Sequence, residues 1–373
     1  MKILQLGKAY PPANLGGVEV VIQLLNEGLN DAGISCDVLG VNDVPIYIKE
    51  KYKQGIIYRA KLLTKKFSTL FSIQLIFILK KIWRKYDIIT IHSPDPMSCL
   101  ALWIVRPKCK IVLYWHSDIL RQKILLKFYK PFLNWLIRRA DLILASSPNY
   151  IEGSKYLLNY RSKCEVLPIG VDTHSDSPAK KGFENRFSKF EGVDFIFSLG
   201  RLAYYKGYEY LVLAANKLIN NAVIIIAGEG EEHDKLLQLI RENDLQNKVY
   251  LVGKITDEEK QYLFKHAKLF VLSSIFKTEA YAIVQVEALS FGLPIVSTQI
   301  EGSGVSWVNQ NNVTGISVPI KDSDSIAFAI NKLLNDEKLY NEYSDNALKR
   351  YQDLFTRKKM IDRANELYIK VLK

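Results

Sequence analysis

The 373-residue chain has few cysteines: Cys36, Cys99, Cys109 and Cys164, with no C-x-x-C spacing among them. Such scattered thiols argue against a disulfide framework or a cysteine metal site and favour a reducing compartment. The five histidines are also too dispersed to suggest a metal cluster. No apolar run approaches the roughly 20 residues needed to span a bilayer, and the N-terminus lacks the apolar core of a signal peptide. We therefore expect a cytoplasmic protein.

Acidic residues are scarce in the first half of the chain. Residues 1–180 hold 26 Lys/Arg and 14 Asp/Glu, whereas residues 181–373 hold 25 of each, so the whole excess of +12 lies in the first half. A basic half predicts an acidic partner, which can be nucleic acid, an anionic membrane or an acidic small ligand. The sequence has no recognised nucleic-acid-binding motif.

Strands and helices alternate along most of the chain, which predicts parallel, doubly wound sheets in two domains. The first domain begins with a strand at Lys2–Gly7, a loop containing Gly16 and Gly17, and a helix at Val18–Ala32. The loop does not have the G-x-G-x-x-G spacing, so nothing here indicates a nicotinamide cofactor. A second strand–helix series begins at Asp194. We predict domains at residues 1–175 and 193–356.

Two segments of the first domain combine basic and large apolar residues, namely Leu62–Tyr86 and Arg121–Arg139. Large apolar residues interspersed with lysines are typical of an interfacial amphipathic helix, so we expect both segments to contact an anionic membrane. The alternative is that they are helices that cover the sheet, with their cations solvated. Pro131 should kink or split the second of these helices.

Two carboxylates stand eight residues apart in T-E-A-Y-A-I-V-Q-V-E-A-L-S, which covers Thr278–Ser290. An apolar segment ending at Ser274 predicts a buried strand before them, and the spacing after Glu279 predicts a helix. Glu279 then lies in the strand-to-helix loop and Glu287 in the helix. Ligands of open α/β sheets bind at this edge, where carboxylates can accept hydrogen bonds from sugar hydroxyls. Taken alone, the pattern also fits an ordinary surface helix.

This stretch resembles the E-x7-E signature of retaining, GT-B-type glycosyltransferases of family 4. Further stretches resemble the same family and follow in its order: SLGRLAYYKGYEYLVLAANKL (Ser198–Leu218), VIIIAGEGEE (Val223–Glu232), GLPIVST (Gly292–Thr298) and NNVTGISVP (Asn311–Pro319). The resemblance implies a GT-B fold, in which two Rossmann-like domains face each other across a cleft. It also implies that the closing helix, residues 357–373, packs back on the first, acceptor-binding domain.

The resemblance implies roles for particular residues. Arg201 and Lys206, in GRLAYYKG, match the diphosphate clamp, and His116, after the strand KIVLYWH, matches a histidine that contacts donor sugar or acceptor. Glu279 would bind the transferred sugar and Glu287 the ribose. The remaining donor-binding positions are Gly16, Gly17, Ala280, Tyr281, Ala282 and Ile283. Ala280 and Ala282 replace the glycines that the family commonly has, while the backbone N–H groups there stay available.

The activity implied is retaining transfer of a hexose, with GDP-mannose as the first candidate donor and UDP-hexoses next. The acceptor would be a lipid-linked saccharide of surface polysaccharide assembly (O-antigen or capsule), met at the inner face of the membrane. The first domain has no Asp-x-Asp motif, so charge stabilisation should need no metal or other cofactor. The alternatives are a GT-B-like sugar-nucleotide epimerase and a non-enzymatic basic protein that binds membrane or nucleic acid.

Overall fold

A computed structural model describes the chain except for residues 12–15, 67–68, 120–122, 173–185 and 220, and it leaves the side chains of residues 123–128 undescribed. Arg121, the first residue of the second predicted membrane segment, and His174 lie outside the described residues. The chain forms two compact units. Unit 1 comprises Met1–Gly170 and Arg357–Lys373, and unit 2 comprises Val171–Thr356.

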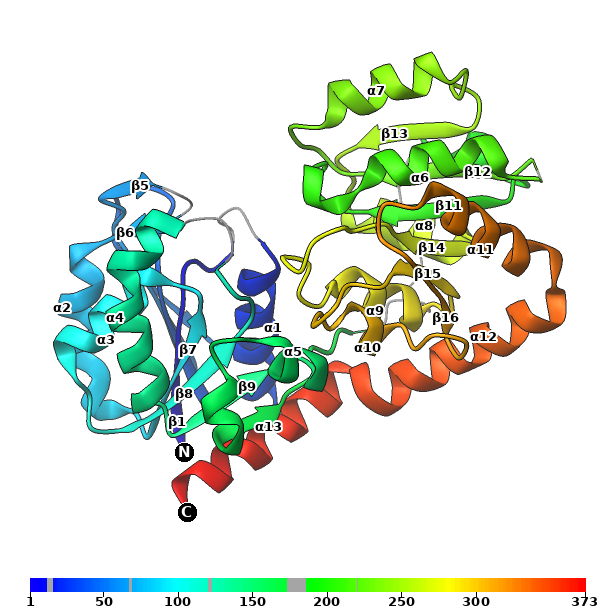
Figure 1. The fold of residues 1–373 in the computed structure, drawn as a ribbon. Helices are drawn as coiled ribbons and strands as arrows, with labels where there is room; N and C mark the ends of the chain where they lie inside the picture. Colours follow the sequence, from blue (N-terminus) through cyan, green and yellow to red (C-terminus); the bar gives the residue numbers. More distant parts are fainter. Residues whose placement is uncertain (12–15, 67–68, 120–122, 173–185, 220) are drawn as a thin grey trace. The chain divides into compact units, whose positions relative to one another are not determined.

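Unit 1 is built on an eight-stranded sheet with the order β10-β9-β8-β7-β1-β2-β4-β3 (Figure 1). All neighbouring strands are parallel except β3, which pairs antiparallel with β4. The strands are β1 (Lys2–Leu6), β2 (Ser35–Val41), β3 (Ile48–Tyr52), β4 (Gly55–Ala60), β7 (Ile88–Ser93), β8 (Lys110–Trp115), β9 (Leu142–Ala145) and β10 (Cys164–Val166). The central strands are almost wholly buried, as expected of a parallel sheet covered on both faces.

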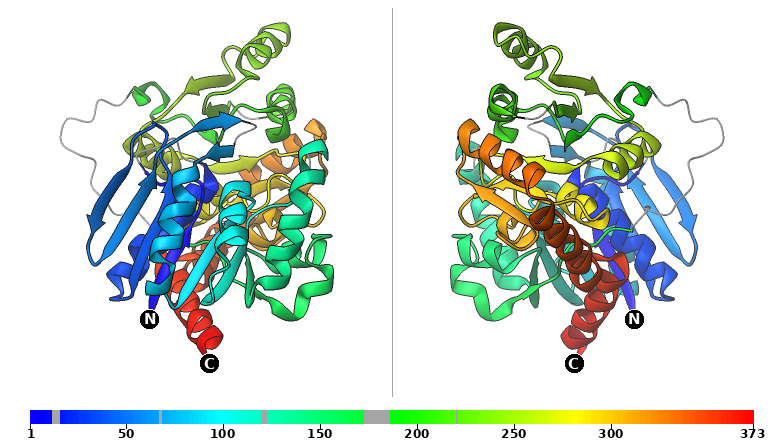
Figure 2. Two further views of the ribbon diagram at one scale, coloured as in Figure 1. Left: turned by 90° about the vertical axis from the view of Figure 1, so that its left-hand side faces the viewer. Right: turned by 90° about the vertical axis from the view of Figure 1, so that its right-hand side faces the viewer.

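Helices cover both faces of this sheet. The helices α2 (Ile73–Ile82), α3 (Pro96–Val105) and α4 (Lys123–Arg139) lie side by side on one face (Figures 1 and 2). On the other face α1 (Gly17–Asp31) packs against the C-terminal helix α13 (Arg357–Leu372). The short helix α5 (Pro148–Gly153) follows β9. Arg357 of α13 forms ion pairs with Glu27 at 3.4 Å and with Asp31 at 3.8 Å, which fixes the start of α13 to α1.

Unit 2 contains a fully parallel six-stranded sheet with the order β13-β12-β11-β14-β15-β16 (Figure 1). Its strands are β11 (Phe195–Leu199), β12 (Val223–Ala227), β13 (Val249–Gly253), β14 (Leu269–Leu272), β15 (Ile295–Thr298) and β16 (Gly315–Val318). Its helices are α6 (Tyr208–Ala214), α7 (His233–Glu242), α8 (Asp257–His266), α9 (Ile283–Ser290), α10 (Val305–Val308), α11 (Ser323–Asn335) and α12 (Glu337–Arg350).

Alternating side chains of β11 show how this sheet is covered. Ile196 packs into an aliphatic core with residues of α6, α7 and α11 such as Leu211, while Phe197 meets Phe264 of α8 on the other face, at 5.0 Å between ring centroids. Because successive strand residues point to opposite faces, both sides of β11 are buried. Both sheets are therefore doubly wound.

The prediction of one amphipathic helix over Leu62–Tyr86 is wrong. Residues 48–60 form the β3–β4 hairpin, and a smaller hairpin follows, with β5 (Thr64–Lys66) paired to β6 (Thr69–Phe71). Among the described residues of this range, only Ile73–Ile82, the helix α2, is an α-helix. Short runs of β-branched and aromatic residues form the strands, and exposed lysines of β3 keep this edge of the sheet polar.

The helix α4 is not split at Pro131, which is one of the two predicted outcomes, because it continues through this residue. Pro131 lies on the exposed side of the helix, where water can solvate the carbonyl that its ring leaves without a donor. Leu133 and Leu136 are fully buried on the opposite side. Within the described part of the chain, no helix is long and apolar enough to cross a membrane.

Candidate active site

The carboxyl ends of β11 and β14 bring together two of the predicted residues. β11 and β14 are parallel neighbours, so the loops that follow them meet at one edge of the sheet. Lys206 ends the 3-10 turn after β11, and Glu279 lies in the loop after β14. Their side chains form an ion pair, with 2.6 Å between Nζ and Oε2. Both residues are buried, with exposed fractions of 7% and 8%.

The ion pair is held by polar neighbours within the unit. Ser274 donates a hydrogen bond to Oε2 of Glu279 at 2.9 Å, so that one carboxylate oxygen accepts from two donors. Burial lowers the pKa of Lys206, but Glu279, together with the neighbouring Tyr208 and Tyr205, more than offsets burial, so the pKa stands above its ordinary value. Lys206 is therefore a cation at neutral pH, although it is almost removed from solvent.

Glycine allows the backbone to make this turn. Gly207, which directly follows Lys206, has a φ of 61° and is the N-cap of α6. A Cβ atom there would lie 2.3 Å from the carbonyl oxygen of Ser273, so any side chain would push the two loops apart. The second glycine of GRLAYYKG, Gly207, is thus required by the backbone geometry, independently of any ligand.

Arg201 occupies a different environment from Lys206. Its side chain is 68% exposed, and Nη2 lies 2.9 Å from Oε2 of Glu231, which is also exposed. An exposed ion pair of this kind contributes little to stability, so Arg201 can leave Glu231 at small cost. A solvated guanidinium on a surface loop can move toward an anion that binds nearby, whereas Lys206 is already fixed.

Helix α9 begins just after Glu279, and Ala282 is its N-cap. Ala282 has φ and ψ of 60° and 77°, in the left-handed region that favours glycine. The replacement of glycine by alanine therefore has a cost that the sequence does not reveal. Ala280 accepts a hydrogen bond from Gly304 N at 2.8 Å, and the ring of Tyr281 is buried near Trp307 and Phe355. Ile283 is the first residue of the helix.

Glu287 lies one turn into α9 and forms an ion pair with a lysine of α8. Oε1 of Glu287 is 2.8 Å from Nζ of Lys260 on α8, and both side chains are partly buried. Burial lowers the pKa of Lys260, but Glu287 and Asp257 together more than offset burial, so the pKa is raised. Lys260 could not be predicted as a partner from the sequence, because nothing in the spacing of α8 relates this lysine to a helix that begins 23 residues later.

In unit 1, His116 follows β8 and is 93% buried. Its Nε2 atom lies 2.8 Å from Nδ1 of His92, which stands near the end of the neighbouring strand β7. Burial lowers the pKa of His116 to about 3, so the ring is neutral at physiological pH. The structure therefore makes His116 one half of a buried histidine pair.

Gly16 and Gly17 stand at the start of α1 and are exposed. The backbone N–H of Gly16 donates to Oε2 of Glu19 at 3.0 Å, so a carboxylate already satisfies this N–H group. Glu19 also places negative charge in the first turn, which stabilises the helix but disfavours an anion at that position. Gly16 can thus approach a neutral sugar more readily than a phosphate.

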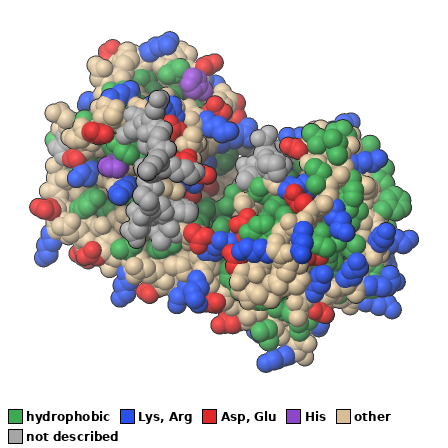
Figure 3. Space-filling model, turned by 180° about the vertical axis from the view of Figure 1, so that it is seen from behind, with side chains coloured by type: hydrophobic (Ala, Val, Ile, Leu, Met, Phe, Trp, Pro, Cys, Tyr) green, Lys and Arg blue, Asp and Glu red, His purple; other side chains and the backbone are tan. Residues whose placement is uncertain are grey.

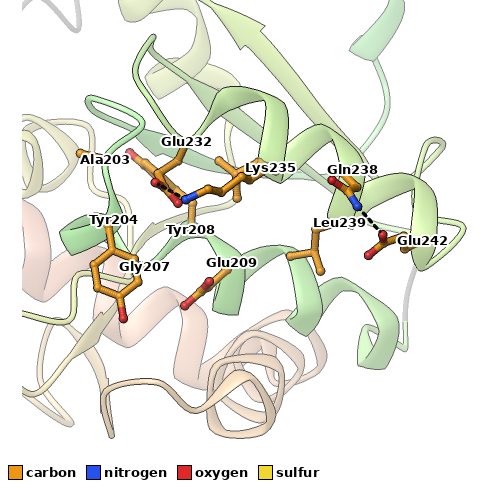
Figure 4. Close-up of a pocket in the computed structure, with 11 residues that line it drawn as sticks. Ala203, Tyr204, Gly207, Tyr208, Glu209, Glu232, Lys235, Gln238, Leu239 and Glu242 are labelled. Carbon is orange, nitrogen blue, oxygen red and sulfur yellow. Dashed lines mark hydrogen bonds and ion pairs between the residues drawn. The ribbon is translucent and has the colours of Figure 1, made fainter.

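A cavity of about 150 Å³ lies between α6 and α7 in unit 2, lined by Tyr204, Tyr208, Glu232 and Lys235 among others (Figure 4). The Lys235–Glu232 ion pair, 3.0 Å between Nζ and Oε1, crosses it. The cavity is small for a sugar nucleotide. None of the predicted donor-binding residues lines it, so the predicted site lies elsewhere. Among the described residues, no group of three or more His, Cys, Asp or Glu side chains could hold a metal ion.

Comparisons with known proteins agree with this architecture. A family described as "Glycosyltransferase Family 4" matches residues 15–175, and one described as "Glycosyl transferases group 1" matches residues 180–350. The structure of Anabaena HepE in complex with UDP-glucose matches with a TM-score of 0.74 at 18% identity, covering 99% of this chain and 100% of that one. Two α/β units, each built on a mainly parallel sheet, define the GT-B class of glycosyltransferases. The predicted fold is therefore confirmed.

Two curated relatives match nearly the whole chain. O-antigen chain mannosyltransferase C of Escherichia coli is 32% identical over 372 residues, covering 100% of this chain and 99% of the relative. D-rhamnosyltransferase WbpZ of Pseudomonas aeruginosa is 30% identical over 357 residues, covering 95% and 92%. The chain belongs to glycosyltransferase family 4, and it is a glycosyltransferase.

Proposed function

We propose that this protein transfers a hexose, with retention of anomeric configuration, from a nucleoside diphosphate sugar to a lipid-linked saccharide in surface polysaccharide biosynthesis. GDP-mannose is the first candidate donor and UDP-hexoses follow. The observation that carries the proposal is the full-length similarity to an O-antigen chain mannosyltransferase, together with the buried Lys206–Glu279 pair that this chain has at its matching motifs.

Lys206 and Glu279 fit the two chemical demands of this reaction. A lysine ammonium has three donors, so Lys206 can keep Glu279 and still donate to oxygens of a leaving diphosphate. Arg201 would add a second positive charge by moving from Glu231. Glu279 has a second oxygen, Oε1, that can accept from hydroxyls of the transferred sugar. A diphosphate oxygen would take the acceptor proton, so the reaction needs no protein nucleophile.

The first test is transfer of labelled sugar from a panel of GDP- and UDP-sugars to a polyprenyl diphosphate-linked saccharide. We expect Lys206→Ala and Arg201→Ala to lower turnover by at least about 100-fold, the size of effect seen when one charge-stabilising group is lost. Lys217→Ala is the matched control, since Lys217 is an exposed lysine of the same unit, paired with Asp324, and should leave turnover unchanged. Turnover within a few-fold of wild type in both site variants would remove these residues from the mechanism.

The two glutamates should have separable kinetic effects. We assign Glu287 to the ribose, with Lys260 holding its carboxylate, so Glu287→Ala should mainly raise the KM for the donor. Glu279→Ala should mainly lower kcat, because its contacts form to the sugar that is transferred. The opposite pattern would exchange the two assignments. Product analysis also separates the alternatives, since an epimerase would return an altered sugar nucleotide without any glycosylated acceptor.

We further propose that unit 1 docks on the anionic inner face of the membrane. Unit 1 carries 31 Lys/Arg against 14 Asp/Glu, whereas unit 2 carries 20 against 25. Unit 1 lies on the right of Figure 3, where Lys and Arg side chains are interspersed with hydrophobic ones over the face in view. On α2, Leu75 and Leu79 are fully buried, while Ile73 and Phe77 are 59% and 66% exposed.

The exposed side of α2 is continuous with cations. Lys80 and Lys81 are exposed and lie three and four residues after Phe77, so that one stripe of the helix combines large apolar and basic side chains. Leu63, in the segment before β5, is 64% exposed as well. Each basic residue near an anionic leaflet contributes roughly 1 kcal/mol, and the apolar side chains add affinity that salt does not screen. The second predicted patch, Arg121–Arg139, includes undescribed side chains, so α2 carries this proposal.

Liposome co-sedimentation tests the docking. Phe77→Ser should weaken binding to anionic vesicles at any salt concentration, whereas charge reversal of Lys80, Lys81, Arg84 and Lys85 should remove the salt-sensitive part. Phe328→Ser is the matched control, because Phe328 is 69% exposed but lies on α11 of unit 2. Equal sedimentation of wild type and both α2 variants would eliminate this surface. Binding to duplex DNA in preference to vesicles at the same salt concentration would favour the nucleic-acid alternative.

A further inference from the structure

A chain of buried hydrogen bonds crosses the centre of unit 1 and ends at His116. Gln5 of β1, His92 of β7 and His116 after β8 stand on three neighbouring strands of the sheet. Oε1 of Gln5 lies 2.7 Å from Nε2 of His92, and Nδ1 of His92 lies 2.8 Å from Nε2 of His116. Gln5 is fully buried and His92 is 1% exposed.

The far end of the chain is anchored by the C-terminal helix. Nε2 of Gln5 donates to the hydroxyl of Tyr368 at 3.4 Å, and Thr90 donates to the same hydroxyl at 3.0 Å. Tyr368 belongs to α13 and is fully buried. With its nitrogen directed to Tyr368, the amide of Gln5 presents its oxygen to His92.

This orientation decides where the protons are. An amide oxygen only accepts, so Nε2 of His92 must carry its hydrogen, which leaves Nδ1 of His92 as an acceptor. Nε2 of His116 must then donate, and Nδ1 of His116 keeps a lone pair. The two rings are nearly parallel, at 8°, with centroids 5.1 Å apart. For nitrogens 2.8 Å apart, this separation places the rings edge to edge, as a straight hydrogen bond requires.

A neutral ring is required for this arrangement. Burial lowers the pKa of His116 to about 3, and burial, with a smaller contribution from His116, lowers the pKa of His92 well below its ordinary value. Each ring therefore carries one proton at neutral pH. No described residue makes a hydrogen bond to Nδ1 of His116, and the side chain keeps 7% of its surface exposed.

We propose that His92, oriented by Gln5, is a positioning residue that fixes His116 in the Nε2–H tautomer, so that Nδ1 of His116 accepts a hydrogen bond from a substrate hydroxyl. The inference rests on the proposed function, because a sugar supplies the hydroxyl. In this tautomer Nδ1 of His116 can only accept a hydrogen bond from the substrate. The site therefore selects a group that donates, such as a hydroxyl, and rejects a group that can only accept. Neither histidine then acts as a proton-transferring acid or base.

The tautomer can be observed without any substrate. In long-range ¹H–¹⁵N spectra of histidine-labelled protein, we expect Nδ1 of His116 to be unprotonated and Nε2 protonated, with the resonances assigned from His92→Phe and His116→Ala. Gln5→Glu keeps an oxygen acceptor and should give the same tautomer, whereas Gln5→Met should give averaged signals. Thr90→Val is the control, since it removes a bond to Tyr368 and leaves Gln5–His92 in place.

Two spectral results would overturn the inference: a protonated Nδ1 of His116 in the wild type, or a Gln5→Met spectrum identical to that of the wild type. In the transfer assay, His92→Phe should lower kcat/KM about ten-fold, the loss expected for one misdirected hydrogen bond, with Gln5→Glu close to wild type. A donor lacking the contacted hydroxyl should be discriminated against by wild type but no longer by His116→Ala. The spectra remain decisive even if no tested sugar is transferred, so failure of the proposed function and failure of this inference are distinguishable.

Discussion

Removing either member of the Lys206–Glu279 pair should strongly destabilise unit 2. The two side chains are 9% and 10% exposed and 2.6 Å apart, so Glu279→Gln leaves a nearly dry ammonium and Lys206→Met a nearly dry carboxylate. Breaking a buried pair in this way costs about 3–5 kcal/mol. A domain is typically stable by only about 5–15 kcal/mol, so each single variant should lose a large share of its stability.

The double variant supplies the sharper test. Lys206→Met/Glu279→Gln removes both charges, and neutral replacement of a buried pair is often close to neutral in stability. We therefore expect the double variant to lose at least about 2 kcal/mol less stability than the sum of the two single losses. This difference is the coupling free energy of the two side chains. The exposed Lys217–Asp324 pair, with side chains 58% and 65% exposed, is the control, and its loss should cost no more than about 1 kcal/mol.

Native-state hydrogen exchange read on peptides of β11 and β14 is the appropriate assay. A two-unit chain need not unfold in one step, and exchange reports the opening free energy of unit 2 separately. Single variants that lose less than 1 kcal/mol, like the control pair, would show that water screens the Lys206–Glu279 pair and would refute the argument from burial.

Three further predictions follow from other parts of the molecule. Ala282→Gly should stabilise unit 2 by about 0.5–1 kcal/mol in the same exchange assay, because it relieves a left-handed φ of 60°, and a loss of stability would contradict this. Unit 1 should lose stability as pH falls below 6.5. The pKa values of His92 and His116 are lowered in the folded state, so the unfolded chain binds more protons than the folded one. The slope is at most about 1.4 kcal/mol per pH unit for each histidine. A pH titration of His92→Asn/His116→Asn should be flatter than that of wild type, and equal slopes would reject the assignment. Sugar transfer should survive EDTA, because Lys206 and Arg201 supply the positive charge; activity lost in EDTA and restored by Mg²⁺ or Mn²⁺ would show that a metal is needed.

Much of the fold could be predicted from the sequence, because local patterns carry it. Apolar runs such as the one that forms β14 and helical spacing such as that of α9 depend on residues close together in the chain. The stretches GRLAYYKG and T-E-A-Y-A-I-V-Q-V-E are also contiguous, so Lys206 and Glu279 could be named as candidates. Where the local signal is mixed, at Leu62–Tyr86, a single helix is expected, but the first part of the segment forms the β5–β6 hairpin and only the second part forms α2, because lysines and large apolar residues suit a strand as well as a helix.

Residues close together in the chain are thus enough to predict most strands and helices, the glycosyltransferase family and the residue types at the sheet edges. Which of these residues become partners depends on the three-dimensional fold. Lys206 and Glu279 are 73 positions apart and meet because β11 and β14 are adjacent strands, although a strand from another part of the chain could have stood between them. His92 and His116 likewise pair because β7 and β8 are neighbouring strands, and Gln5 reaches His92 from β1. Burial then keeps His92 and His116 neutral, since the same side chains would be solvated in an unfolded chain.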